Sequence, residues 1–171
     1  MKLLARVVLA AALALTTAST LGPAAAAGGA HTAHLSASNE VPTNESRAQG
    51  QFVSWLSADG TELRYRLVFA NLENPVAAHI HVAPEGVNGP VVAFLHGPAA
   101  PGGGVTSGVV ATGTITADDL LGPLAGQPLS ALVAAIEAGG TYVNAHTSDG
   151  DPTTTGGPGD IAGGEIRGQI R

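Results

Sequence analysis

Three histidines on two predicted strands have the residue type and spacing of metal ligands. His79 and His81 stand one residue apart in AHIHVAPEGVNGPVV, and His146 lies in the later run TYVNAHT. Alternate residues of a strand point to one face, so His79 and His81 share a face, and an imidazole from a neighbouring strand can join them. Neutral imidazoles are good ligands for Cu and Zn. His79, His81 and His146 are therefore candidate ligands of a Cu or Zn ion.

Other polar residues belong to the same face if the three strands that carry them are neighbours. Asn144 alternates with His146, and Glu165 alternates with Arg167 in the final run GEIRGQI, while the intervening residues are apolar. Asn144 or Glu165 could orient a ligand imidazole from the outer shell, by a hydrogen bond to the ring nitrogen that does not bind the metal. Arg167 could favour a bound anion near the site or pair with Glu165.

A second interpretation of this polar face needs no metal. Hydrogen-bonded side chains on neighbouring strands can fix the strand register and pack beneath a loop. His96, at the end of another predicted strand, is either a fourth ligand or a solvated strand-end residue. From the sequence, both interpretations stay open.

Short runs of alternating apolar and polar residues, separated by dense Gly and Pro, must position these side chains. They predict an all-β fold, an antiparallel β-sandwich or Greek-key barrel. Residues 51–56 and 62–69 are predicted to form a hairpin around a turn at 57–60. Further strands are predicted at 77–82, 90–95, 108–115, 141–146 and 164–170.

One short connecting helix interrupts the strands. Leu129, Leu132, Val133 and Ile136 recur at helical spacing, and a Gly pair at 139–140 ends them. We expect this amphipathic helix to cover one end of the sheet.

The segment 147–163, between two predicted strands, is long and rich in Gly, Pro, Thr and Asp. Loops of this length in small domains are usually functional or disordered. Asp149 and Asp151 could contribute to a Ca²⁺ site, but two carboxylates are few for an ion that takes about six to eight oxygen ligands. The role of the loop stays open.

The first 27 residues have the features of a secretory signal peptide. Lys2 and Arg6 flank the start of an apolar run that is too short to span a bilayer comfortably, and Ala25 and Ala27 stand where a signal peptidase prefers small residues. We expect cleavage after Ala27 to leave one secreted domain, residues 28–171, with no membrane span.

The charge of that domain is strongly negative. Without Lys2 and Arg6, five basic residues face thirteen acidic ones, which gives a formal charge of −8. Such a surface disfavours nucleic acid and anionic membranes as partners. The chain has no Cys, which excludes disulfides, Cys-ligated zinc, iron–sulfur clusters, blue copper and thiol chemistry.

Four motifs, in order along residues 28–171, resemble those of CHRD domains, a family named after chordin. They are LSASNEVP, AHIH with NGPVV, AGGTYVNAHT and GEIRGQI. The resemblance implies a single secreted β-domain and assigns it no molecular activity. Segment 147–163 is a departure, because many members of the family have a short connection there.

A weaker resemblance links the histidine pattern to Cu/Zn superoxide dismutases. In those β-sandwiches an H-x-H strand and a later strand ending in His bind copper, and a Gly-rich loop and a short last strand follow. The order is similar here, but there is no Cys pair, and only His96 stands between His81 and the helix, where a cluster of His and Asp would bind zinc. The resemblance implies a copper site of related geometry and does not imply dismutase activity.

From these observations we expect a secreted, non-enzymatic binding or structural module with an unidentified extracellular partner. The chain has neither a G-x-S-x-G elbow nor a phosphate-binding Gly loop, so enzymatic activity is the less favoured expectation. The alternative is a copper- or zinc-binding protein with a superoxide-dismutase-like His site, and a carbohydrate or cell-surface adhesion module is a third interpretation. The functional face would comprise His79, His81, Asn144, His146, Glu165 and Arg167.

Overall fold

The alternating segments form eight strands in the computed structural model, which describes residues 29–153 and 156–171. The predicted signal peptide and its cleavage site lie outside these residues. The strands are β1 His31–Ser36, β2 Gln49–Leu56, β3 Leu63–Glu73, β4 Pro75–Val82, β5 Val91–His96, β6 Val105–Ile115, β7 Thr141–Thr147 and β8 Ile166–Gln169. The helices are α1 Leu129–Glu137 and the single 3₁₀ turns η1 Ala37–Asn39, η2 Ala117–Asp119 and η3 Gly122–Leu124.

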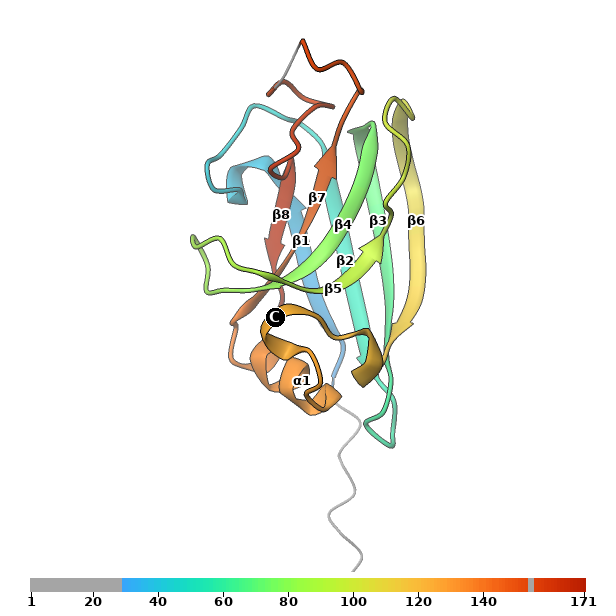
Figure 1. Ribbon diagram of the computed structural model, residues 1–171, viewed down its shortest axis with the longest axis vertical. Coiled ribbons are helices and arrows are strands. Elements are labelled where there is room, and N and C mark those ends of the chain that lie inside the picture. Colours follow the sequence, from blue (N-terminus) through green and yellow to red (C-terminus); the bar gives the residue numbers. More distant parts are fainter. Residues whose placement is uncertain (1–28, 154–155) are drawn as a thin grey trace, which may run out of the picture.

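One antiparallel sheet, in the order β5-β4-β7-β8-β1-β2-β3-β6, curls into a nearly closed barrel (Figure 1). The terminal strands of this order, β5 and β6, contact each other. The Tyr65 hydroxyl of β3 donates to the carbonyl oxygen of Leu95 in β5 at 2.8 Å, across the line where the barrel closes. The all-β fold and the β2–β3 hairpin are confirmed.

The apolar residues of the alternating pattern fill the barrel. Ile80, Val143 and Ile166, from β4, β7 and β8, are fully buried in one hydrophobic core. As predicted, α1 covers one end of the barrel, where Leu132 and Ile136 join the same core (Figure 1). Burial of a side chain of this size contributes about 1.5–3 kcal/mol, so the core and the sheet hydrogen bonds hold a domain that has no disulfide.

The last strand is shorter than predicted, because it begins at Ile166 and not at residue 164. Gly164 has a φ of 126°, which side chains rarely adopt, and its N–H bonds back to the carbonyl oxygen of Ile161. The chain is therefore still part of the preceding loop at Gly164, and it enters the sheet only after Glu165.

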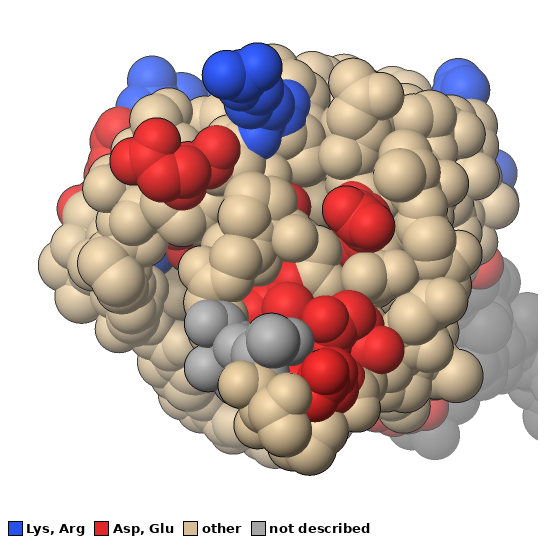
Figure 2. Space-filling model, turned by 90° about the horizontal axis from the view of Figure 1, so that it is seen from above, with Lys and Arg blue, Asp and Glu red and all other residues tan. Residues whose placement is uncertain are grey.

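The end of the barrel opposite α1 carries the loop 147–163 and is acidic. Figure 2 shows Asp and Glu side chains gathered around this end. Within the loop, the Asp149 carboxylate accepts from the N–H of Asp151, and the Asp151 carboxylate accepts from the N–H of Thr153. This end favours cations over anions. No helix in the described part of the chain is long and apolar enough to cross a bilayer.

Candidate metal centre

The polar sets of three strands meet on the outside of the barrel, because β4, β7 and β8 are neighbours. In the sheet register, Asn144 of β7 lies opposite His79 of β4 on one side and Arg167 of β8 on the other. His81 of β4 lies opposite Tyr142 of β7. The alternation read from the sequence therefore places these side chains on one face.

Three imidazoles converge on this face. His79, His81 and His146 each offer one ring nitrogen, and these nitrogens all lie within 4.8 Å of one another. The ring centroids of His79 and His146 are 4.9 Å apart, and those of His79 and His81 are 5.7 Å apart. His96 lies outside this cluster. Ligand nitrogens at about 2.0–2.1 Å from one metal ion lie at most about 4.2 Å apart, so the three rings would have to move closer together to bind it.

Two backbone carbonyl groups in loops determine, for His81 and His146, which ring nitrogen carries no hydrogen. The carbonyl oxygen of Gly89 lies 2.9 Å from His81 Nδ1, and that of Ala162 lies 2.8 Å from His146 Nδ1. A carbonyl can only accept, so both Nδ1 atoms carry the hydrogen and both Nε2 atoms carry the lone pair. Outer partners of this kind commonly orient metal-binding imidazoles.

The lone pairs point into the cluster. His146 Nε2 lies 3.1 Å from His79 Nδ1, from which it accepts a hydrogen bond. His81 Nε2 is buried and has no hydrogen-bond partner among the described residues. An unpaired buried nitrogen is costly, and a metal ion would satisfy it.

All three imidazoles are neutral at neutral pH, which is the form that binds a metal. Burial, together with the smaller effects of the neighbouring His146 and His81, lowers the pKa of His79 to about 4. Burial also lowers the pKa values of His81 and His146, although their loop carbonyls act in the opposite direction. Protons therefore compete weakly for these nitrogens.

The sequence reasoning missed the two carbonyls that orient the rings. A Cβ at Gly89 would lie 2.0 Å from the carbonyl oxygen of Val82, so only glycine allows this loop to reach His81. The NGPVV motif contained this signal. Ala162 belongs to the long loop 147–163, so that loop contributes directly to the cluster.

Arg167 does not pair with Glu165, contrary to one of the roles considered for it. Its side chain is 1% exposed and lies over the Tyr142 ring, with its guanidinium carbon 3.4 Å from the ring centroid. It donates to Asn88 Oδ1 at 3.0 Å and to the carbonyl oxygen of Val87 at 2.9 Å. The Tyr142 ring in turn stacks on His81, at 4.7 Å between centroids. Arg167 therefore braces a stack that ends at a candidate ligand.

Glu165 holds the long loop, and its carboxylate forms no hydrogen bond to any of the three histidines. Its carboxylate accepts from the hydroxyls of Ser46 and Thr147, at 2.5 Å and 2.6 Å, and from the N–H of Gly159 at 2.7 Å. The loop carbonyls therefore have the imidazole-orienting role considered for Glu165. Glu165 acts indirectly, by holding the loop that carries the Ala162 carbonyl group.

Replacing Glu165 with Gln should destabilise the domain by about 3 kcal/mol, because the amide cannot accept from all three donors and leaves one of them unpaired in a buried site. Urea unfolding monitored by circular dichroism measures this loss. Glu137→Gln, at the exposed end of α1, should change the unfolding free energy by less than about 0.5 kcal/mol. A loss below about 1 kcal/mol in Glu165→Gln would contradict the role assigned to this carboxylate.

Glu40 is a buried acid at this face that the sequence reasoning did not single out. It is 4% exposed, and one of its carboxylate oxygens, Oε1, has no hydrogen-bond partner in the described part of the chain. Burial raises the pKa of Glu40 to about 7, and Arg167 and Asn144 only partly oppose this. Its position in the LSASNEVP motif was the available signal.

In the metal-free protein, Glu40 should make stability fall as pH rises. The pKa of this carboxyl group is about 7 in the folded chain and 4.5 in the unfolded chain. Its contribution to the free energy of unfolding is therefore fully present below about pH 4.5 and is lost as the pH rises through about 7. We expect Glu40→Gln to be more stable than the wild type by about 3 kcal/mol at about pH 8, with little difference near pH 4.

Urea unfolding of both proteins at the two pH values tests this prediction. Glu45→Gln, which removes an exposed carboxyl group from the same connection, should track the wild type at both. A Glu40→Gln advantage of equal size at both pH values would show that ionisation of Glu40 is not the cause.

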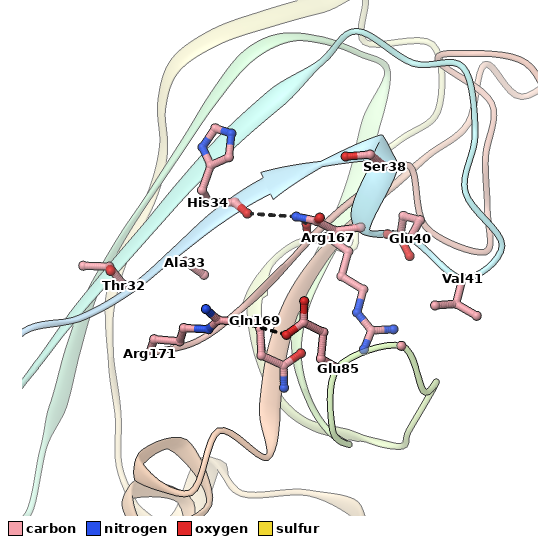
Figure 3. Close-up of a pocket in the computed structure, with 12 residues that line it drawn as sticks. Thr32, Ala33, His34, Ser38, Glu40, Val41, Glu85, Arg167, Gln169 and Arg171 are labelled. Carbon is pink, nitrogen blue, oxygen red and sulfur yellow. Dashed lines mark hydrogen bonds and ion pairs between the residues drawn. The ribbon is translucent and has the colours of Figure 1, made fainter.

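A pocket of about 510 Å³ lies next to this region, between the η1 connection and the β4–β5 loop. Arg167 and Glu40 form part of its wall, and the ion pair between Arg171 and Glu85, at 2.7 Å, lies across from them (Figure 3). None of the three clustered histidines lines it. The pocket is therefore separate from the histidine cluster.

Comparison with known protein families gives one match. The CHRD domain model matches residues 31–170, which is most of the chain. The chain belongs to the CHRD domain family. No curated protein and no solved structure matches it. The resemblance of the CHRD domain's histidine pattern to Cu/Zn superoxide dismutases therefore stays a prediction from the sequence.

Membership of the CHRD domain family accounts for the order of the motifs along the chain. AHIH supplies His79 and His81, TYVNAHT supplies His146, and GEIRGQI supplies Glu165 and Arg167. In the folded CHRD domain these motifs form the three adjacent strands β4, β7 and β8.

Proposed function

We propose that this CHRD domain is a secreted protein that binds one Cu or Zn ion through His79 Nδ1, His81 Nε2 and His146 Nε2. The observation that carries the proposal is the buried, unpartnered Nε2 of His81, held towards the other two rings by the bond from Nδ1 to the Gly89 carbonyl oxygen. When bound, the ion would supply Lewis acidity or, for copper, one-electron chemistry.

The donor set supports this choice of ions. Three neutral imidazoles without thiolate or carboxylate ligands suit Cu and Zn better than Ca²⁺ or Mg²⁺, which prefer oxygen. The strands hold the three Cα positions rigidly, and two of the rings are fixed in the tautomer that leaves Nε2 free. His79 must lose the Nδ1 hydrogen and carry it on Nε2 to become the third ligand.

The remaining polar residues of the face support a scaffolding role. The buried carboxylate of Glu165 and the buried guanidinium of Arg167 are occupied by hydrogen bonds to loops. A partner molecule would therefore meet the loops that cover these groups. We assign the protein a binding function and no reaction, in keeping with the non-enzymatic expectation.

Metal content is the test of this proposal. The mature protein, made without a His tag, would be loaded with Zn²⁺ or Cu²⁺, desalted and analysed by elemental mass spectrometry. We expect about one ion per chain in the wild type and none in His79→Ala/His81→Ala. His34→Ala/His96→Ala removes two histidines from outside the cluster and should keep the ion. A folded wild type that retains no metal would refute the proposal.

A further inference from the structure

Asn144 is a buried residue beside the histidine cluster, and the structure shows no hydrogen-bond partner for its side-chain oxygen among the described residues. It lies on β7, two residues before His146 and directly opposite His79. The side chain is 3% exposed, yet its Oδ1 has no hydrogen-bond partner among the residues that the structure describes. An unpaired amide oxygen in such a place is energetically costly, and a bound cation would satisfy it.

The surroundings of Asn144 define which way its amide faces. A Cβ placed on Gly164 would lie 2.6 Å from Glu40 Oε1 and 2.7 Å from Asn144 Nδ2, so the carboxyl group and the amide nitrogen flank the same glycine. The nitrogen and oxygen of an amide group diverge from the same carbon, so with Nδ2 towards Glu40 the oxygen Oδ1 is directed away from this carboxyl group.

Two buried atoms without hydrogen-bond partners among the described residues, Asn144 Oδ1 and His81 Nε2, belong to the adjacent strands β7 and β4. Both have a lone pair and neither has a hydrogen to donate, so they cannot satisfy each other. A cation between them would satisfy both. The strand register also places Asn144 directly between His79 of β4 and Arg167 of β8, beside the cluster.

We propose that Asn144 Oδ1 is a fourth ligand of the ion held by His79, His81 and His146, and that Glu40 is the positioning residue that turns this oxygen towards the ion. The inference rests on the proposed function. Three nitrogens and one neutral oxygen form a site for divalent Zn²⁺ or Cu²⁺, because the softer Cu⁺ gains little from an amide oxygen.

The test compares two substitutions of similar size. Asn144→Leu removes the oxygen, and Asn144→Asp keeps one. Zn²⁺ affinity would be measured by competition with a chromogenic chelator, and the Cu²⁺ protein by electron paramagnetic resonance. We expect Asn144→Leu to bind Zn²⁺ at least about 10-fold more weakly, a loss that an outer partner can also cause. The change in the Cu²⁺ g and hyperfine values identifies a direct ligand, and Cu⁺ affinity should change less than about threefold. Asn144→Asp should bind Zn²⁺ at least as tightly as the wild type.

Thr141→Val is the matched control, because it removes another buried, unpartnered oxygen from β7. Thr141 lies on the opposite face of this strand from Asn144. It should leave the affinity and spectrum unchanged. An Asn144→Leu protein that matches the wild type in Zn²⁺ affinity and Cu²⁺ spectrum would overturn this inference and leave the three-histidine site intact.

Two further outcomes are decisive. If Asn144→Leu does not fold, the spectrum of Asn144→Asp decides, because a charged oxygen ligand must shift the Cu²⁺ parameters and an unchanged spectrum overturns the inference. If the wild type binds no metal at all, the proposed function fails and this inference fails with it.

Discussion

His81→Ala should weaken Zn²⁺ binding more than about 100-fold, beyond the 10–100-fold loss typical of an outer partner of a ligand. The substitution removes the one ring nitrogen of the cluster that is both buried and unpartnered. It also removes the ring on which Tyr142 stacks, so the stack of Arg167 and Tyr142 no longer extends to the metal site.

Isothermal titration in a buffer that does not bind zinc measures this effect. His34→Ala, which removes an exposed imidazole of β1, should bind Zn²⁺ like the wild type. Equal losses in His34→Ala and His81→Ala would mean that zinc binds to surface histidines in general and not to the cluster.

Arg167→Met should destabilise the domain by about 3–5 kcal/mol. The guanidinium is fully buried and donates to Asn88 Oδ1 and to the carbonyl oxygen of Val87, and its hydrogen bonds from a charged group contribute about 1.5–3 kcal/mol each. Methionine fills similar space but leaves these acceptors without a donor and removes the cation from the Tyr142 ring.

Chemical unfolding of the metal-free protein measures this loss. Arg167→Lys should lose nearly as much, because an ammonium group cannot reproduce the planar fork that reaches two loop acceptors. Arg64→Met, at an exposed ion pair with Glu62, should cost less than about 1 kcal/mol. A loss below about 1 kcal/mol in Arg167→Met would show that the buried charge is as costly as its bonds are favourable.

The period-two alternation of the strands made much of the site predictable. In AHIH, TYVNAHT and GEIRGQI, alternate residues are polar, so each strand's faces could be assigned before the strand order was known. Which strands are neighbours could not be derived from spacing, because β4, β7 and β8 are separated by long connections. The convergence of His79, His81 and His146 depended on that order.

The parts of the site that could not be predicted come from loops. The carbonyl oxygens of Gly89 and Ala162 orient two rings, but any residue has a carbonyl oxygen, so residue type carries no signal. Glu40 reaches Asn144 from the connection after β1, a contact that only tertiary packing creates. Residue type suggested an Arg167–Glu165 pair, whereas both side chains find loop partners instead.

The loop 147–163 has a structural explanation that its composition did not reveal. Glu165 and Thr147 bind the backbone N–H groups of Gly159 and Ile161, which places the carbonyl oxygen of Ala162 on His146. Gly, Pro and Asp allow the tight turns of this path, and the carboxylate beneath it sets its course. The insertion thus completes one wall of the histidine cluster.

Anomalous X-ray diffraction from crystals of the zinc-loaded protein, recorded on both sides of the zinc absorption edge, tests the central claim most directly. We predict one strong peak about 2.0–2.1 Å from His79 Nδ1, His81 Nε2 and His146 Nε2. A zinc peak elsewhere on the molecule, or no peak between these three rings at full zinc occupancy in solution, would contradict the account.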